Sequence, residues 1–246
     1  NIIRNYLKKK FKVIVVSSAM SGATNELINK SRLISNNFNK SEYDVLLSAG
    51  EQIACSLISG RLNHLGIKSK SFMSWQVPII SSQDYSNGKI LSIPQKNIKE
   101  FLKIGGVPII AGFQGINSNN RITTLGRGAS DYTAIMVAKY FNAYKCIIYT
   151  DVEGVMTTDP KVFRGAKKIN EISYEEMLEM SSLGSKVMQS NSVQDARLNR
   201  INIYVKSSFS KSKGTLITKK KNITSSKVIR GISFTKNDAK LTLASV

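Results

Sequence analysis

The sequence has few cysteines, histidines and prolines. Its 246 residues include two cysteines, one histidine and four prolines. Cys55 and Cys146 lie among apolar neighbours, so we expect buried free thiols in a reducing compartment. Metal-ligand spacing is absent, and His64 stands at the expected end of a helix, where a surface position is the ordinary one. These absences exclude a disulfide scaffold and a histidine–cysteine metal site.

Long apolar runs are also missing. No run approaches the roughly 20 residues of a membrane span, so we expect a soluble, cytoplasmic protein with no membrane partner. Basic residues precede the apolar Val13–Val16 and resemble the start of a signal peptide, but this block is too short, and we expect a strand. The sequence starts at Asn1 within an expected helix, so we expect it to lack its natural beginning.

Acidic residues are scarce relative to basic ones. The chain has 36 basic and 16 acidic residues, a net charge of +20. Such a charge is typical of proteins that bind nucleic acid. The lysines, however, are scattered among Asn, Ser and Ile and form no basic patch with aromatic residues. A compositional bias explains this pattern better, and an anionic substrate such as a nucleotide would also be attracted.

Short apolar runs alternate with helical patterns. Lys12–Ser17, Val107–Ala111 and Cys146–Tyr149 have the composition of buried strands, and each is followed by small or polar residues. Strands that alternate with helices favour an α/β sandwich with a parallel sheet. We also expect a strand at Trp75–Ile80.

A long helix is expected over residues 42–65, with a core face that consists of Val45, Leu46, Ile53, Leu57, Ile58 and Leu62. Glu51 interrupts this face. A glutamate there is usually solvated, but its small neighbours favour contact with another surface or a ligand.

The stretch Thr123–Asp159 organises the chain. Gly126 and Gly128 let a backbone approach a ligand closely, and Ser130 or Asp131 can cap the helix that follows. The N-terminus of that helix favours an anion.

A second polar group follows the strand Cys146–Tyr149. Thr150 and Asp151 stand at its carboxyl end, where open α/β sheets bind ligands. Further on, Gly184–Val187 is expected to open a helix, and its Lys186 opposes the helix dipole unless an anion offsets the charge. This lysine points to a phosphate partner.

Seven segments resemble the amino-acid kinase superfamily and, within it, the aspartokinases. They cover nearly the whole chain in the family's order, and TLGRGASD with TDVEGVMTTDP is the most specific combination. The segments are Val16–Leu27, Leu46–Ala54, Ala111–Ile116, Thr123–Ala134, Tyr149–Pro160, Ile172–Gln189 and Val205–Ile217. The resemblance implies the amino-acid kinase fold, a three-layer αβα sandwich with a mostly parallel sheet.

The resemblance also implies a domain organisation. Residues 1–218 would form the catalytic domain with an incomplete N-terminus, 219–227 a linker, and 228–246 the truncated start of an ACT-like regulatory domain. We expect a homo-oligomer, with a separate chain carrying the missing segments as a possible further partner.

The implied activity is ATP-dependent phosphorylation of the β-carboxylate of L-aspartate to 4-phospho-L-aspartate. This is the first step of lysine, diaminopimelate, threonine and methionine synthesis in the family. The expected partners are L-aspartate and ATP, with Mg²⁺ held mostly by the phosphates and water rather than by protein side chains.

The family's site residues map onto this sequence by analogy. Arg127 would pair with the α-carboxylate of aspartate, Glu51 would hold its ammonium group, and Asp131 would assist there. The other residues expected to line the aspartate pocket are Ser18, Thr24, Phe113 and Ser130. The residues expected at the nucleotide are Gly126, Gly128, Thr150, Asp151, Lys161, Lys186 and Val187. Asp131 and Lys186 are the implied catalytic residues.

Three departures from the family bear on activity. The sequence has no Lys-Phe-Gly-Gly segment, whose lysine neutralises the transferring phosphoryl group; contacts of that kind are often worth about 2–4 kcal/mol. Met156 replaces a tyrosine on the nucleotide side, and Lys161 replaces an arginine, which keeps the charge but loses the forked geometry. The regulatory region is incomplete, so no feedback effector is assigned.

Three hypotheses therefore stay open. The first is an aspartokinase, and the second is a catalytically inactive fragment that still binds nucleotide or a partner chain. The third, a nucleic-acid-binding module, depends on charge alone.

Overall fold

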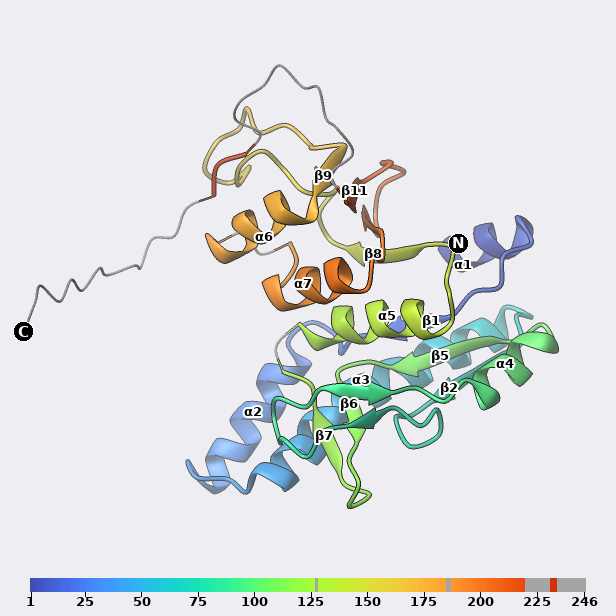
Figure 1. The fold of residues 1–246 in the computed structure, drawn as a ribbon. Coiled ribbons are helices and arrows are strands. Elements are labelled where there is room, and N and C mark those ends of the chain that lie inside the picture. Colours follow the sequence, from blue (N-terminus) through green and yellow to red (C-terminus); the bar gives the residue numbers. More distant parts are fainter. Residues whose placement is uncertain (127, 185–186, 220–230, 234–246) are drawn as a thin grey trace, which may run out of the picture. The chain divides into compact units, whose positions relative to one another are not determined.

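The chain forms two compact units, residues 1–144 and 145–246. The computed structural model describes residues 1–126, 128–184, 187–219 and 231–233, and Figure 1 labels most of the elements. The elements of unit 1 are α1 (Ile2–Lys8), β1 (Val15–Ser17), α2 (Ala23–Ile34), α3 (Lys40–His64), β2 (Ser69–Phe72), β3 (Ile80–Ser81), β4 (Ile90–Ser92), α4 (Lys96–Lys103), β5 (Val107–Ala111), β6 (Gln114–Ile116), β7 (Ile122–Thr124) and α5 (Ala129–Tyr140). The elements of unit 2 are β8 (Cys146–Thr150), β9 (Glu171–Ser173), α6 (Tyr174–Ser182), α7 (Ser190–Leu198), β10 (Ile203–Ser207) and β11 (Thr215–Thr218).

Two small sheets form the framework of unit 1. In the first, β5 lies between β1 and β2 and runs parallel to both, and all its residues are buried. Its sequence VPIIA suits a parallel strand that is covered on both faces. In the second sheet, ordered β4-β3-β6-β7, β6 pairs parallel with β3 and antiparallel with β7. Since β1 and β5 are parallel neighbours, their carboxyl ends meet at one edge.

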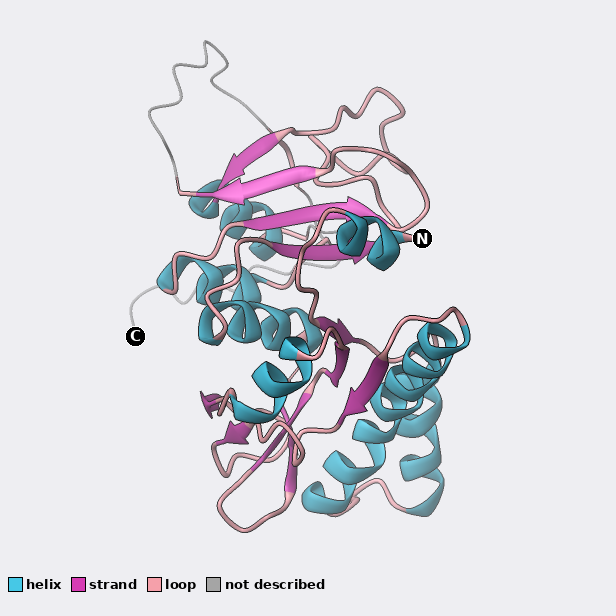
Figure 2. Cartoon of the chain, turned by 90° about the vertical axis from the view of Figure 1, so that its right-hand side faces the viewer, coloured by secondary structure: helices cyan, strands magenta, loops and turns pink. Residues whose placement is uncertain are grey.

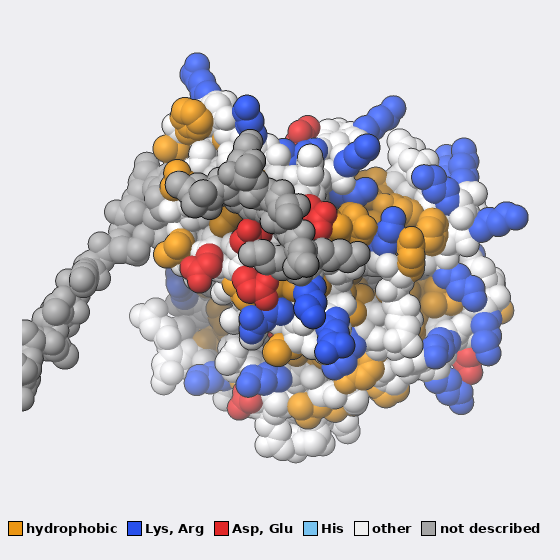
Figure 3. Space-filling model, turned by 45° about the horizontal axis from the view of Figure 1, so that its top comes forward, with side chains coloured by type: hydrophobic (Ala, Val, Ile, Leu, Met, Phe, Trp, Pro, Cys, Tyr) orange, Lys and Arg blue, Asp and Glu red, His pale blue; other side chains and the backbone are white. Residues whose placement is uncertain are grey.

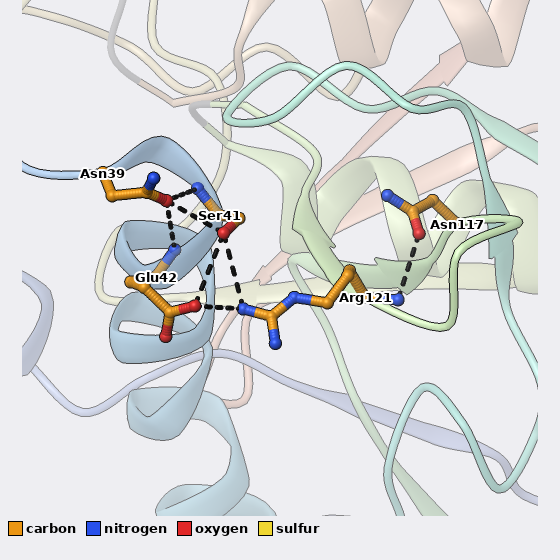
Figure 4. A network of polar contacts seen from close by, with 5 residues as sticks. All are labelled: Asn39, Ser41, Glu42, Asn117 and Arg121. Carbon is orange, nitrogen blue, oxygen red and sulfur yellow. Dashed lines mark hydrogen bonds and ion pairs between the residues drawn. The ribbon is translucent and has the colours of Figure 1, made fainter.

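A polar network fixes the start of α3 (Figure 4). The Asn39 side-chain oxygen accepts hydrogen bonds from the backbone N–H groups of Ser41, at 2.9 Å, and Glu42, at 3.3 Å. An N-cap of this kind is worth about 1 kcal/mol. The Arg121 guanidinium donates to the Glu42 carboxylate and the Ser41 hydroxyl. The backbone N–H of Arg121 donates to the Asn117 side-chain oxygen. Because Arg121 directly precedes β7, the network joins the helix to that strand.

The buried face of α3 matches the predicted one only in part: Leu62 is buried and Ile58 packs beside it, as expected. Ile53 and Leu57 are 51% and 57% exposed, so their assignment to the core was wrong. The inward face instead carries Asp44, Ser48 and Glu51 beside small and apolar residues. The exposed pair and the polar set both recur at helical spacing, so hydrophobicity alone misassigned Ile53 and Leu57. The polar set is buried because other elements supply its hydrogen-bond partners.

The described residues of unit 2 form one sheet with the order β8-β10-β11-β9. β10 runs parallel to β8 and antiparallel to β11, and β9 runs parallel to β11. Figure 2 shows these four strands side by side, two pointing each way. Helix α6 begins with a capping box: the Ser173 hydroxyl accepts from the Glu176 N–H at 3.1 Å, and the Glu176 carboxylate accepts from the Ser173 N–H at 2.9 Å.

Two expected elements are wrong. Trp75–Ile80 forms consecutive turns, with Ile79 N–H donating to the Ser74 carbonyl at 2.7 Å, and only Ile80–Ser81 is strand. The Gln76 side chain accepts from the Met73 N–H at 3.0 Å, which stabilises a turn rather than a ladder. The helix expected to open at Gly184–Val187 begins at Ser190.

The α/β class is confirmed, since helices accompany sheets whose pairing is mostly parallel. Cys55 and Cys146 are buried and outside any disulfide. The predicted linker, 219–227, and the ACT-like start, 228–246, fall almost wholly outside the described residues and stay predictions.

The capping box gives a test of unit 2. We expect Ser173→Ala to lower the free energy of unfolding by about 1 kcal/mol, because one N–H at the start of α6 loses its acceptor. Urea unfolding followed by circular dichroism measures this. The matched control is Ser182→Ala, which removes an exposed hydroxyl at the other end of α6 and should change stability by less than about 0.5 kcal/mol. Equal effects of both variants would contradict the capping account.

Candidate functional site

Several chain segments meet at the edge of unit 1 where β1 and β5 end. Gly112, directly after β5, donates from its N–H to the Ser17 carbonyl at 3.0 Å. A Cβ on Gly112 would lie 2.9 Å from that oxygen and 3.0 Å from the Ser130 side chain, so glycine lets the first turn of α5 approach this edge. Helix α3 approaches through Gly50, whose added Cβ would lie 3.0 Å from the Ala19 side chain.

Glu51 is buried on α3 beside the loop that follows β1. Its side chain is 4% exposed, and Oε1 accepts a hydrogen bond from the Ala19 N–H at 3.1 Å. Oε2 is buried without a hydrogen-bond partner among the described residues. Burial raises the pKa of this carboxyl from 4.5 to about 7. A half-satisfied buried carboxylate is costly, so this atom marks a place for a ligand that donates protons or carries positive charge.

Asp131 lies in the first turn of α5, close to the same edge. Burial raises the pKa of its carboxyl from 3.8 to about 6. Glu51 and Asp131 therefore both favour the neutral form more than ordinary carboxyl groups do. Buried carboxyl groups with raised pKa values are typical of functional sites, because a charged partner can offset their desolvation.

Phe113 has an unusual backbone conformation at the end of β5. Its φ is +66°, in the left-handed region that non-glycine residues rarely occupy. Two contacts hold it: its N–H donates to the Thr133 hydroxyl at 3.2 Å, and its carbonyl accepts from the Leu125 N–H at 3.0 Å. Such strain clusters at binding sites, where surrounding contacts fix one geometry.

The glycine-rich loop differs from the prediction at the helix cap. The N-cap of α5 is Gly128, with φ +69°, and no side chain caps it, so the expected capping by Ser130 or Asp131 is wrong. Both residues instead lie within the first turn, where their side chains are left for other contacts. Gly126 has φ +85°, and Arg127 lies outside the described residues.

Unit 1 thus brings five of the predicted aspartate-site residues to one edge. They are Ser18, Glu51, Phe113, Ser130 and Asp131. Ser18 is exposed between Ser17 and Ala19, and Thr24 is half-buried in the first turn of α2. The role of each residue stays a prediction.

In unit 2, two of the predicted nucleotide residues, Thr150 and Asp151, lie at the end of β8. The Thr150 hydroxyl donates to the Asp151 carboxylate at 3.0 Å, and the Thr150 carbonyl accepts from the Ser208 N–H at 2.8 Å. The loop after Asp151 is tied to β11, since the Val155 N–H donates to the Thr215 hydroxyl at 2.9 Å.

The other predicted nucleotide residues of unit 2 lie further along the chain. Lys161 is exposed in a turn closed by its N–H to the Asp159 carboxylate, at 2.8 Å. Val187 is half-buried shortly before α7, and Lys186 lies outside the described residues.

The sequence matches the Amino acid kinase family over residues 1–207. The chain belongs to this family. The aspartokinase of Rickettsia felis (strain ATCC VR-1525 / URRWXCal2) is 43% identical over 249 residues, which cover 100% of this chain and 62% of that protein. The aspartokinase of Geobacillus stearothermophilus is 39% identical over 246 residues, covering 100% of this chain and 60% of that protein. The chain thus spans less than two thirds of the length of these relatives.

Solved aspartate kinases share the fold of this amino acid kinase family member. The aspartate kinase of Synechocystis has a TM-score of 0.77 and 37% identity, covering 89% of this chain and 36% of that one. Aspartokinase III of E. coli, crystallised in complex with aspartate and ADP, has a TM-score of 0.71 and 28% identity, covering 90% of this chain and 48% of that one.

Sequence reasoning missed the buried polar residues that surround this edge. Gln114 is fully buried, and its side-chain N–H donates to the Ser48 carbonyl of α3 at 3.2 Å. Asp44 is also fully buried. The polar spacing at 44, 48 and 51 was a signal in principle, but a polar helical stripe is normally the solvated face.

Surface features add little to the site. Two hollows, lined by Lys70, Trp75 and Phe101 and by Tyr174, Arg197 and Arg200 among others, contain no predicted site residue. On the face seen in Figure 3, basic side chains are scattered rather than gathered in one patch, which does not favour the nucleic-acid hypothesis. Within the described ranges, no helix is long and apolar enough to cross a membrane.

The raised pKa of Glu51 predicts a pH-dependent stability. The folded chain holds this proton more tightly than the unfolded chain, so the stabilisation is complete below about pH 4.5 and is lost as the pH rises through about 7. Glu51→Gln keeps the neutral shape, so we expect it to be more stable than the wild type by up to about 3 kcal/mol at pH 8, with the difference vanishing near pH 4.5. Denaturant unfolding at several pH values measures this.

The matched control is Glu100→Gln, an exposed glutamate on α4. Its difference from the wild type should not change with pH. A pH-independent difference for Glu51→Gln as well would show that Glu51 is ionised in the folded chain at neutral pH.

Proposed function

We propose that the protein is an aspartate kinase, which transfers the γ-phosphoryl group of ATP to the β-carboxylate of L-aspartate. The observation that carries this proposal is the buried Glu51 carboxylate, with Oε2 unpartnered among the described residues, at the edge where β1 and β5 end. An ammonium group supplies both the positive charge and the donors that this oxygen lacks. The relatives named aspartokinase, and the E. coli enzyme solved with aspartate and ADP, support this choice of substrates.

In the proposed complex, Glu51 binds the ammonium of aspartate, and Arg127 binds its α-carboxylate. Asp131 stands at the N-terminus of α5 and assists at the ammonium group. Ser18, Thr24, Phe113 and Ser130 line the rest of the pocket. These contacts hold the β-carboxylate in place, and phosphoryl transfer depends mainly on such positioning and on charge neutralisation.

The proposed reaction balances without a covalent enzyme intermediate. A β-carboxylate oxygen attacks the γ-phosphorus, the bond from that phosphorus to the bridging oxygen breaks, and ADP leaves as 4-phospho-L-aspartate forms. Lys186 neutralises charge on the phosphates, and Thr150 and Asp151 contact the adenosine. Gly126, Gly128, Lys161 and Val187 complete the nucleotide contacts. We place the product at the entry to lysine, diaminopimelate, threonine and methionine synthesis.

Mg²⁺ accompanies the nucleotide in this proposal. Among the described residues, no group of three or more histidine, cysteine or carboxylate side chains is placed to hold a metal ion. We expect ATP phosphates and water to coordinate the magnesium ion, where it neutralises phosphate charge.

The test separates binding from turnover. We expect L-aspartate to bind by calorimetry with an affinity that rises about tenfold from pH 6 to pH 8, because Glu51 must ionise to pair with the ammonium. Glu51→Gln should weaken binding and remove its share of this pH dependence, while Glu100→Gln should match the wild type. Aspartate-dependent turnover of ATP is measured by trapping the acyl phosphate as a hydroxamate.

The outcomes discriminate between the hypotheses. Hydroxamate formation supports the kinase. Binding of aspartate and ADP without turnover supports the alternative, an inactive aspartokinase chain that retains binding. If L-aspartate binds at none of the pH values measured, the proposed substrate is wrong.

A further inference from the structure

Asp44 is a buried carboxylate that the proposed reaction does not use. It lies on the inward face of α3, two helical turns before Glu51, and is 0% exposed. Its Oδ2 accepts from the backbone N–H groups of Ser86 and Thr124, each at 2.8 Å. Its Oδ1 accepts from the hydroxyls of Ser86, at 2.9 Å, and Thr124, at 2.8 Å. Four donors thus satisfy one carboxylate, and all four come from outside the helix.

The two donor residues belong to segments that border the glycine-rich loop. Thr124 is the last residue of β7, two residues before Gly126. Ser86 lies in the loop between β3 and β4 and has φ +64°, a left-handed conformation that Asp44 helps to hold. The same loop also bonds directly to β7, because the Gly88 N–H donates to the Thr124 carbonyl at 2.9 Å. Asp44 therefore fixes the end of β7 together with the loop packed against it.

The segment after β7 leads directly into the proposed substrate site. The Leu125 N–H donates to the Phe113 carbonyl, and a Cβ added to Gly126 would lie 3.3 Å from the Asn87 side-chain oxygen. The other end of the loop is fixed at α5, where Gly112 packs against Ser130. The loop is thus held at both ends, and Asp44 supplies the buried polar anchor at its first end.

A second anchor joins α3 to β7 but is exposed. Arg121, before β7, pairs with Glu42, and the two side chains are 40% and 56% exposed. Exposed ion pairs are screened by water and contribute little, whereas hydrogen bonds to a buried charge contribute more. Asp44 therefore stabilises the position of the loop more than the Arg121–Glu42 pair does.

We propose that Asp44 is a positioning residue for aspartate binding. It fixes the end of β7 so that the segment leading from β7 into α5 meets the edge where β5 ends. This inference rests on the proposed function, because its consequence is measured as affinity for aspartate. A residue with a merely structural role would instead weaken the whole of unit 1.

The test compares variants that remove donors or the acceptor. Asp44→Asn puts an amide where N–H donors converge. Thr124→Val removes one donated hydroxyl at nearly constant volume, and Thr124→Ser keeps it. The controls are Ser69→Ala, which removes a buried hydroxyl bonded to the Val107 carbonyl elsewhere in unit 1, and Glu42→Gln, which removes the exposed ion pair.

Hydrogen exchange in the absence of ligand reports on the loop itself. We expect backbone exchange over residues 122–131 to accelerate about tenfold in Asp44→Asn and about threefold in Thr124→Val, with Thr124→Ser near the wild type. Exchange in β2 should stay unchanged in these variants. Ser69→Ala should instead accelerate exchange in β2 and leave exchange over residues 122–131 unchanged.

Binding reports on the consequence. Affinity for L-aspartate should fall about tenfold in Asp44→Asn and about threefold in Thr124→Val, while affinity for ADP stays within twofold. Unchanged exchange and unchanged affinity in both variants would overturn the proposal. Equal acceleration across all of unit 1 would also overturn it, because the role would then be structural only.

The two proposals fail separately. If the wild type binds no aspartate, the proposed substrate is wrong, yet the exchange pattern still decides whether Asp44 positions the loop. If Asp44→Asn does not fold, the contrast between Thr124→Val and Thr124→Ser decides instead.

Discussion

Unit 1 depends on hydrogen bonds that the buried face of α3 makes with the ends of three strands. Asp44 binds the end of β7, Gln114 of β6 donates to the helix backbone, and Glu51 binds the loop after β1. Buried polar groups cost several kcal/mol when they lack partners, so each bond holds its segment in one position. An apolar helix face would pack these strands with less control over how their ends line up, because apolar contacts are non-directional.

Two carboxylates on this face illustrate how position becomes function. Asp44 has four donors and leaves no demand for a ligand. The Glu51 side chain accepts a hydrogen bond from the Ala19 backbone N–H, and its second oxygen is satisfied by no described residue. Both side chains are almost fully buried, so the difference between them lies in their partners rather than in exposure. The unsatisfied carboxylate faces the edge where parallel strands end, which is the usual ligand position in α/β sheets.

Much of this arrangement could be predicted from the sequence. The apolar run at β5 and the helix that follows the glycine-rich loop depend on local chemistry, and both predicted elements are confirmed. The inward face of α3 could not be predicted in the same way. Ile53 and Leu57 outscore Asp44 and Ser48 in hydrophobicity, and the partners that make polar burial favourable come from segments more than 30 residues away. The predicted cap of α5 was also wrong. Gly128 adopts the left-handed conformation and is itself the N-cap, so Ser130 and Asp131 lie inside the helix.

The central claim is that a buried, half-satisfied carboxylate at the edge of unit 1 receives the ammonium group of an amino acid. The most direct measurement is a crystal structure of the chain with L-aspartate bound. We expect the aspartate nitrogen to lie within hydrogen-bond distance of Glu51 Oε2, with the ligand beside Phe113 and the first turn of α5. Aspartate bound with its ammonium away from Glu51, or a water molecule on Oε2 in the complex, would contradict it.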